Sequence, residues 1–245
     1  DQSDVPNEDA RSLVFDDTTL FAADKFSGFD RIETGTRFNY GLRYTAQGYE
    51  GGMLRATFGQ SQQIAGDNSF AQGSGLEEDE SDYVASLYAQ PSTAFALFGQ
   101  ARFDNETFEA ERIDASANVT TRFVGGSVRY AFSRQNDIND EQEDDEEVSV
   151  SAYMQLSEFW RAFGAYRYDL TNDFNATRSL GIGYADECFT FSVSYQETNI
   201  EDREIDADRA LTLRIELKHI GGTTFKTDAI NELLAESTDE TDATL

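Results

Sequence analysis

The sequence is short of the residues on which most enzyme and metal sites depend. It contains one cysteine, Cys188, and one histidine, His219, among its 245 residues, which excludes a histidine cluster or a Cys-x-x-Cys pair within the chain. GxGxxG, P-loop and GxSxG motifs are also absent, so no nucleotide site or hydrolase nucleophile is indicated. No stretch approaches the ~18 consecutive apolar residues of a membrane-spanning helix. We therefore expect no enzyme, no cofactor and no metal.

Positive charge is scarce as well. The chain has 19 Lys and Arg against 47 Asp and Glu, a formal net charge of −28, which would repel the phosphates of nucleic acids. Acidic chains are often disordered, but 13% of these residues are aromatic, so the chain is expected to fold. Its start, DQSDVPNEDARS, lacks the basic and apolar parts of a signal peptide. Two interpretations stay open: a soluble acidic protein, or a membrane barrel separated from its signal and N-terminal part.

Apolar and polar residues alternate with a period of two from Arg37 onward. About eleven segments show the pattern, each close to the ~9–11 residues that cross a bilayer as a tilted strand. In the first, RFNYGLRYTA, Leu42 falls on one face and Arg43 on the other. The pattern predicts an all-β, antiparallel transmembrane β-barrel. We expect strands over residues 36–222, an acidic external loop region at 1–35 and an acidic tail at 223–245.

The connections between these segments alternate in length. Short turns are expected near Gly48–Gly51, Gln90–Thr93, Thr121–Phe123, Ser157–Phe159 and Ala185–Glu187. Longer acidic connections are expected near Ala65–Asp82, Asp104–Glu111, Arg134–Glu147, Asp169–Thr177 and Glu197–Asp208. Bacterial outer-membrane barrels have this asymmetry, with short periplasmic turns and longer external loops. The acidic run Asn139–Glu147 is either a divalent-cation site or a solvated loop.

Basic residues within the strands share the polar parity. A lipid-facing Arg at the bilayer midplane costs roughly 2–4 kcal/mol, so a barrel must turn such residues inward. The predicted lumen-lining residues are Arg43, Arg55, Arg102, Arg129, Arg161, Arg167, Arg214 and Lys218.

Several stretches resemble a known family. They are the acidic N-terminal stretch leading into YGLRY, then FGQSQQIAGDNSF with GSGLEEDESDYV, and GYADECFTFSVSYQE with ALTLRIELKHIGG. These stretches are similar to the barrels of LptD lipopolysaccharide-assembly proteins, and the resemblance covers nearly the whole chain. It implies the C-terminal strands of a larger barrel in the outer membrane. The implied function is delivery of lipopolysaccharide into the outer leaflet, without covalent chemistry.

The resemblance also assigns roles to particular residues. Many family members carry adjacent cysteines in the last periplasmic turn. Here Glu187 replaces the first and Cys188 matches the second, which implies one disulfide to a cysteine outside this chain; a free thiol is the alternative. The lipid would leave where the first and last strands meet. The expected last strand, Arg209–Ile220, and the glycines after it supply the lateral-gate residues Leu211, Leu213, Ile215, Leu217, Gly221 and Gly222. The two glycines either weaken closure or simply end the strand.

The implied partners are lipopolysaccharide, an LptE-like plug lipoprotein and an LptA-like periplasmic bridge reached through an N-terminal domain outside this chain. The inward basic residues would contact phosphates or acidic sugars of the lipid, or the plug. Alternatively, they are the ordinary charges of a polar barrel wall. Two other functions stay open: a porin-like passive channel and a soluble acidic β-sandwich binding module.

Overall fold

A computed structural model describes residues 15–26, 32–49, 51–134, 144–199, 208–218 and 221–227. Within these residues the chain forms twelve strands and no helix. The strands are β1 (Thr36–Gln47), β2 (Met53–Ala65), β3 (Tyr83–Ser92), β4 (Phe95–Phe103), β5 (Ala110–Thr120), β6 (Val124–Ser133), β7 (Asp145–Gln155), β8 (Trp160–Asp169), β9 (Phe174–Ala185), β10 (Phe189–Thr198), β11 (Asp208–Leu217) and β12 (Gly221–Thr227). In the described part, no helix is long and apolar enough to cross a membrane.

The strands follow one another in a single sheet in chain order, from β1 to β12. Neighbouring strands pair in antiparallel fashion from β1 to β4 and from β8 to β12, and the register shifts at Thr36/Arg37, Ala89/Ser92 and Arg167/Tyr168. β1 and β12 stand at the two ends of the strand order, so the described sheet has two edges. The predicted all-β antiparallel fold is confirmed.

The twelfth strand was not predicted from the sequence. We expected the strands to end at Gly222, but β12 runs from Gly221 to Thr227 and pairs with β11. Its sequence, GGTTFKT, contains a single large apolar residue, so it has no period-two pattern to recognise. Its strand character comes from the hydrogen-bonding partner, β11. The rest of the predicted acidic tail, 228–245, lies outside the described residues.

The connection between β8 and β9 also differs from the expectation. A long loop was predicted at Asp169–Thr177, whereas β9 begins at Phe174 and the connection covers only residues 170–173. Asp169 Oδ1 accepts a hydrogen bond from the backbone N–H of Asn172 (2.8 Å), and Asp173 takes a left-handed conformation with φ 55°. Asp and Asn favour such tight turns, so this connection is an exception to the predicted alternation.

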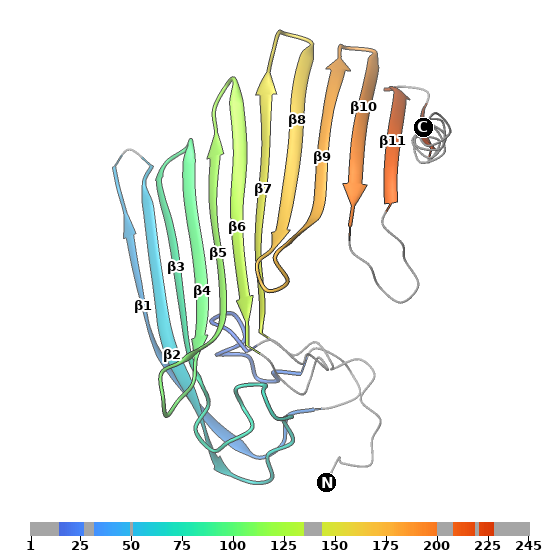
Figure 1. The fold of residues 1–245 in the computed structure, drawn as a ribbon. Coiled ribbons are helices and arrows are strands. Elements are labelled where there is room, and N and C mark those ends of the chain that lie inside the picture. The colour runs from blue at the N-terminus through green and yellow to red at the C-terminus, as the bar shows by residue number, and fades with distance from the viewer. Residues whose placement is uncertain are drawn as a thin grey trace, which may run out of the picture. The chain divides into compact units, whose positions relative to one another are not determined.

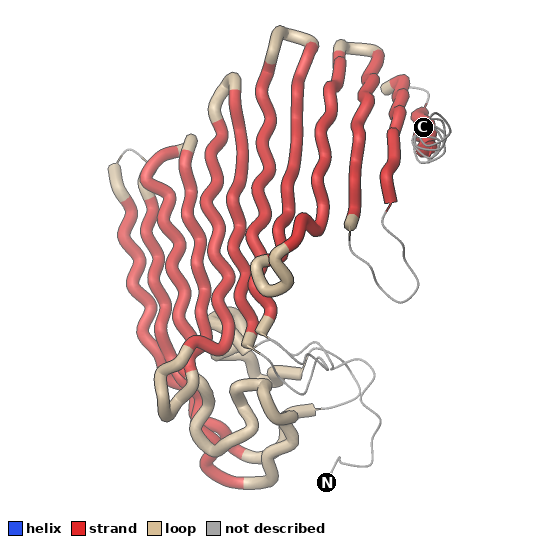
Figure 2. The backbone as a smooth tube through the Cα atoms, in the orientation of Figure 1, coloured by secondary structure: helices blue, strands red, loops and turns tan. Residues whose placement is uncertain are grey.

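The chain divides into two compact units. Unit 1 comprises residues 1–118 and 129–147, and unit 2 comprises 119–128 and 148–245. In unit 1, the connection 66–82 and the segment 15–26 gather at the end of β1–β4 away from the 48–52 turn (Figures 1 and 2). In unit 2, the short turns 156–159 and 186–188 lie at one end of β7–β10 (Figure 1).

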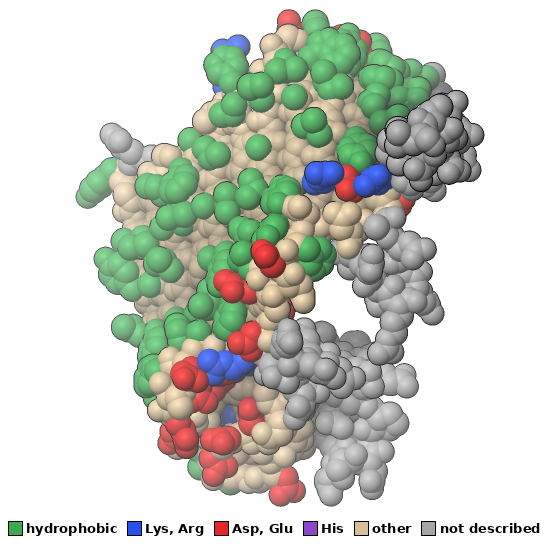
Figure 3. Space-filling view, viewed as in Figure 1, with side chains coloured by type: hydrophobic (Ala, Val, Ile, Leu, Met, Phe, Trp, Pro, Cys, Tyr) green, Lys and Arg blue, Asp and Glu red, His purple; other side chains and the backbone are tan. Residues whose placement is uncertain are grey.

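The sheet has two chemically different faces, which we call the apolar face and the polar face. The apolar face carries Leu42, Phe58 and Leu87 in unit 1 and Leu180 and Ile182 in unit 2, all of them exposed. Leu42 is 74% exposed and Leu180 69%, values typical of a surface that meets lipid or a partner rather than water. Figure 3 shows such hydrophobic side chains spread over the strands.

Candidate functional site

The polar face of unit 1 is organised in rows across the strands. Arg43 in β1, Thr57 in β2, Ser86 in β3 and Gln100 in β4 are register partners. Arg43 Nε donates to Thr57 Oγ1 at 3.3 Å, and Gln100 Nε2 donates to Asp114 Oδ2 at 3.2 Å. The row thus presents a side chain that can form hydrogen bonds on each of the four strands.

Unit 2 has a comparable row. Arg161 in β8, Gly183 in β9, Ser192 in β10 and Arg214 in β11 are register partners. The Arg161 guanidinium carbon lies 4.7 Å from the centroid of the Tyr153 ring. Two arginines therefore border a stretch of small side chains, which leaves their guanidinium groups accessible.

The predicted lumen residues do not converge on one point. Arg43, Arg55, Arg129, Arg161, Arg167 and Arg214 are exposed along their strands, while Arg102 is buried. Lys218 lies just beyond β11, and its ammonium group donates to the backbone carbonyl of Asp186. The exposed arginines of each unit form a polar wall on its polar face, whereas Arg102 and Lys218 anchor other segments.

A loop cap covers one end of the polar face of β1–β4. We define the loop cap as segment 15–26 together with connection 66–82. Its core consists of buried apolar side chains that include one residue of β3. They are Phe15, Leu20, Phe70, Leu76 and Val84, with Phe26 packed against them. Phe26 and Phe70 stack with ring centroids 4.5 Å apart.

Segment 15–26 packs closely against β1 and β2 because it begins with a local turn and because the strands have glycines at the contact. Asp16 Oδ1 accepts hydrogen bonds from the backbone N–H groups of Thr18 (2.8 Å) and Thr19 (3.1 Å), a common turn arrangement for Asp. The turn places Leu20 over Gly41 and Gly59, where an added Cβ would meet the Leu20 side chain. The close approach therefore requires glycine at Gly59.

Arg102 joins connection 66–82 to β4. Its Nη1 donates to the carbonyl of Ser74 (2.6 Å) and its Nη2 to the carbonyl of Gly73 (3.0 Å). Its Nε lies 3.2 Å from Asp82 Oδ2. Gly75 has φ +77°, and an added Cβ there would lie 2.8 Å from Arg102 Cδ. A buried guanidinium is stable only with such a set of partners, so Arg102 holds the loop cap in place.

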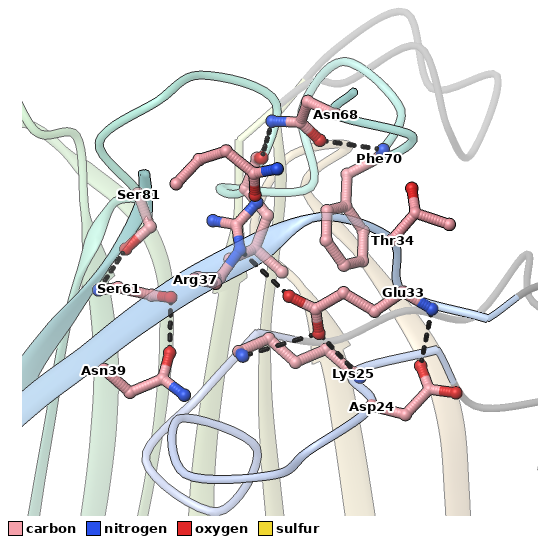
Figure 4. Close-up of polar contacts among 12 residues, drawn as sticks. Asp24, Lys25, Glu33, Thr34, Arg37, Asn39, Ser61, Asn68, Phe70 and Ser81 are labelled. Atoms are coloured by element: carbon pink, nitrogen blue, oxygen red, sulfur yellow. Dashed lines mark hydrogen bonds and ion pairs between the residues drawn. The ribbon is translucent and has the colours of Figure 1, made fainter. Parts of the chain in front are cut away.

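A second charged group joins segment 15–26 of the loop cap to β1 (Figure 4). Glu33 lies between Lys25 and Arg37, with Oε2 at 3.6 Å from Lys25 Nζ and Oε1 at 3.0 Å from Arg37 Nε. All three side chains are less than a tenth exposed. The Arg37 guanidinium also stacks 5.3 Å from the Phe70 ring centroid. Burial lowers the pKa of Lys25, although Glu33 opposes the shift.

Asp82 is the titratable group of the loop cap with the largest perturbation. Burial raises the pKa of its carboxyl group to about 7, despite the opposing effect of the Arg102 guanidinium. The nearby acids Glu77, Glu111 and Asp104 add to the rise. Since this pKa lies near neutrality, the charge of the loop cap changes in the physiological range.

Cys188 lies in the short turn between β9 and β10, where it is exposed. Asp186 Oδ1 accepts hydrogen bonds from the backbone N–H groups of Cys188 (2.8 Å) and Phe189 (2.7 Å). These bonds lower the pKa of Asp186. The backbone N–H of Lys218 donates to the Cys188 carbonyl at 3.0 Å. The thiol is thus accessible on a well-defined turn.

The predicted lateral-gate residues fall on two strands. Four of them, Leu211, Leu213, Ile215 and Leu217, lie in β11. β11 pairs with both β10 and β12, so it is not the terminal strand. Gly221 and Gly222 begin β12, the end of the strand order, opposite Leu217 and Glu216.

Sequence reasoning missed two features. The loop cap was expected only as an acidic loop region, because the spacing of Phe15, Leu20, Phe70 and Leu76 has no period that links distant loops. Charged residues on the apolar face of β9–β11 were missed because they lie near strand ends, where a period of two is hard to recognise, although basic residues were expected only on the polar face. No three His, Cys, Asp or Glu side chains group as a metal site in the described part. The acidic run Asn139–Glu147 lies largely outside the described residues.

Comparison with known proteins gives a consistent result. The family model "LptD: LPS transport system D" matches residues 1–160. The chain is 24% identical over 240 residues to the LPS-assembly protein LptD of Alcanivorax borkumensis, covering 95% of the chain and 31% of that protein. It is 23% identical to the LPS-assembly protein LptD of Hahella chejuensis, covering 90% of the chain and 28% of that protein. The LPS-assembly protein LptD of Nitrosococcus oceani is 25% identical, with 90% of the chain and 29% of that protein covered.

The chain spans about a third of the length of these relatives. Their names describe lipopolysaccharide assembly and no catalytic activity. The family model covers more than half of the chain, and the all-β antiparallel sheet fits it. The chain therefore belongs to the LptD family.

Proposed function

We propose that this chain forms strands of an outer-membrane β-barrel that delivers lipopolysaccharide to the outer leaflet. The observation that carries the proposal is the two-faced sheet of an LptD-family chain. Its exposed leucines and isoleucines suit lipid, and the opposite face carries a wall of exposed arginines. Such a sheet closes into a barrel with its polar face inside.

In this proposal the polar face guides the sugar and phosphate part of the lipid. Guanidinium groups bind phosphate strongly, and Arg43 and Arg214 lie in polar rows where they stay exposed. The loop cap lies over one end of the polar face of β1–β4 and narrows that end. A capped lumen disfavours the porin-like channel, which needs an open path for water.

We assign lipid exit to the edge strand β12 and to β11, its neighbour in the sheet. The glycines Gly221 and Gly222 start this strand opposite β11, and they offer no side chains for packing. The remaining family expectations are part of the same proposal: an LptE-like plug against the polar face, and an LptA-like bridge reached through a domain outside this chain.

We further propose that Cys188 forms a disulfide with a cysteine outside this chain. Its exposed position on a short turn leaves the thiol accessible, and cysteines of outer-membrane proteins mature in an oxidising compartment. Non-reducing and reducing gels of the natural full-length protein, with and without Cys188→Ser, test this. A mobility shift that needs Cys188 is expected, and identical gels would contradict it.

Transport is tested by reversing charge on the polar face. In cells that depend on the natural gene containing this chain, Arg43→Glu with Arg55→Glu should reduce arrival of newly made lipopolysaccharide at the cell surface. Arg122→Glu, in the exposed 121–123 turn, makes the same kind of charge change away from the polar wall and should leave delivery intact. Membrane fractionation checks that both proteins reach the outer membrane. Unchanged delivery by the Arg43 and Arg55 variant would contradict the proposed path.

A further inference from the structure

The apolar face of unit 2 carries one charged row. Arg178 in β9, Glu197 in β10 and Arg209 in β11 are direct register partners, and Tyr166 in β8 precedes Arg178 in the same row. Figure 3 shows basic and acidic side chains side by side over β9–β11, next to hydrophobic side chains. This row lies on the opposite face of the sheet from the arginines of the proposed transport path.

The carboxylate of this row is covered while the guanidinium groups are not. Glu197 Oε2 accepts hydrogen bonds from Arg178 Nε (2.9 Å) and Nη2 (2.6 Å), and from the Tyr195 hydroxyl group (3.0 Å). Arg209 Nη2 lies 3.6 Å from Glu197 Oε1. The Glu197 side chain is 6% exposed, whereas Arg178 and Arg209 are 55% and 44% exposed. The row therefore presents positive charge outward.

Glu197 does not balance both arginines. Two guanidinium groups share one carboxylate, so the row carries one net positive charge on a chain whose net charge is −28. A guanidinium has five N–H donors. The hydrogen bonds to Glu197 use only Nε and Nη2 of Arg178. The row thus retains donors and charge for an external anion.

The position of the row along the strands corresponds to the edge of the apolar band of an outer-membrane barrel. On β10, eight residue steps separate Glu197 from Phe189 beside the turn, with Phe191, Val193 and Tyr195 on the same face between them. At ~3.3 Å per residue this is about 26 Å along the strand. At the ~40° tilt of barrel strands it is roughly 20 Å in height, close to the ~25 Å apolar band of an outer-membrane barrel.

The two ends of β10 lie on opposite sides of that apolar band: Phe189 follows the short turn, and Glu197 of the charged row lies at the other end. β10 begins after the short 186–188 turn and ends at Thr198, where the longer connection 199–207 follows. In bacterial barrels short turns are periplasmic and longer connections are external. The row therefore lies at the level of the outer-leaflet headgroups.

We propose that Arg178 and Arg209 bind a phosphate group of an anionic lipid headgroup in the outer leaflet, against the lipid-facing wall of β9–β11. Planar guanidinium groups match phosphate oxygens with paired hydrogen bonds. Glu197 and Tyr195 hold Arg178 in place beneath the ligand. The inference rests on the outer-membrane barrel of the proposed function, but not on the transport of lipid through it.

The test uses the natural full-length protein reconstituted in phosphatidylcholine nanodiscs with a small fraction of diphosphoryl lipid A. Native mass spectrometry measures the lipid A retained. Arg178→Gln with Arg209→Gln should weaken retention about tenfold or more, since hydrogen bonds to charged groups are lost. The matched control, Arg122→Gln with Arg134→Gln, removes two arginines that lie outside both this row and the polar wall, in the 121–123 turn and just beyond β6, and should retain lipid A like the wild type.

Two further arms keep the test decisive. Arg209→Gln alone leaves the Arg178–Glu197 hydrogen bonds in place and should still lose lipid A several-fold, which separates binding from misfolding. Inorganic phosphate is added as a competitor. Wild-type retention by the Arg178 and Arg209 variants, an equal loss in the control pair, or displacement of lipid A by millimolar phosphate would each overturn the proposal. Loss of lipid A with normal surface delivery separates it from the transport function.

Discussion

Removal of the Arg102 charge should open the loop cap while the strands stay intact. Arg102→Met keeps most of the side-chain volume but removes the hydrogen bonds to the Ser74 and Gly73 carbonyls and the ion pair with Asp82. Breaking one partner of a buried ion pair typically costs ~3–5 kcal/mol. Because the Asp82 carboxyl group has a pKa of about 7, it takes up a proton easily, and we expect the lower end of that range.

A cost of about 3 kcal/mol corresponds to roughly a hundredfold larger population of the open loop cap. Hydrogen exchange of the full-length protein in detergent measures this population locally. The informative amides are those of Ser81 and Asp82, which donate to the carbonyls of Ser61 (2.9 Å) and Gly75 (2.9 Å). Their exchange should accelerate about a hundredfold, while amides of β9 and β10 keep the wild-type rate.

Arg43→Met is the matched control. Arg43 lies on the same face but is exposed, and its Nε donates to Thr57 rather than to the loop cap. Its loss should leave exchange at Ser81 and Asp82 unchanged. Equal exchange in the Arg102→Met and wild-type proteins would refute the claim that Arg102 anchors the loop cap.

Three other predictions follow from the same contacts. The raised pKa of Asp82 means that the folded loop cap binds a proton more tightly than the open one, so this stabilisation is present at low pH and is lost as the pH rises through about 7. After correction for intrinsic exchange rates, the loop cap should be about 1.4 kcal/mol, or roughly tenfold, more stable at pH 6 than at pH 8; Asp82→Asn should remove the difference, and a persistent difference would assign it to another group. Leu42→Arg on the apolar face should impair membrane assembly, at a cost of roughly 2–4 kcal/mol, whereas Thr45→Arg on the polar face should assemble normally; equal yields of folded protein on heat-modifiability gels would contradict the assignment of the faces. Gly59→Val should displace Leu20 and expose segment 15–26 to protease, while Gly99→Val, where an added Cβ has no atom within 4 Å, should not; equal cleavage of the two variants would show that Leu20 is not held at Gly59.

The strands could be predicted because a half-apolar sheet imposes its period directly on the sequence. The alternation of Leu42 with Arg43, or of Val193 with Ser194, indicates which side chain lies on the apolar face and which on the polar face. β12 lacks this alternation, since its sequence is GGTTFKT, and its register is set by pairing with β11. The early start of β9 at Phe174 was hidden because Asn and Asp residues there resemble a loop.

The loop cap could not be predicted from the sequence for a different reason. Phe15 and Phe70 are brought together by the folding of two connections, which neighbouring residues do not specify. The same applies to Arg102, whose parity predicted the correct face but not its burial under Ser74 and Gly75. Arg178 and Arg209 escaped notice because each lies near a strand end, where a period of two cannot distinguish a strand from a turn.

The central claim is that the sheet crosses a membrane with one face to lipid and one to a polar interior. Spin labels at single cysteines along β10, in a Cys188→Ser background of the full-length protein in lipid bilayers, test it most directly. Labels at Phe191, Val193 and Tyr195 should be accessible to oxygen and shielded from a water-soluble nickel complex. Labels at Ser192, Ser194 and Gln196 should show the reverse. Alternation of this kind is the predicted result, and six labels with uniform access to the nickel complex would contradict the account.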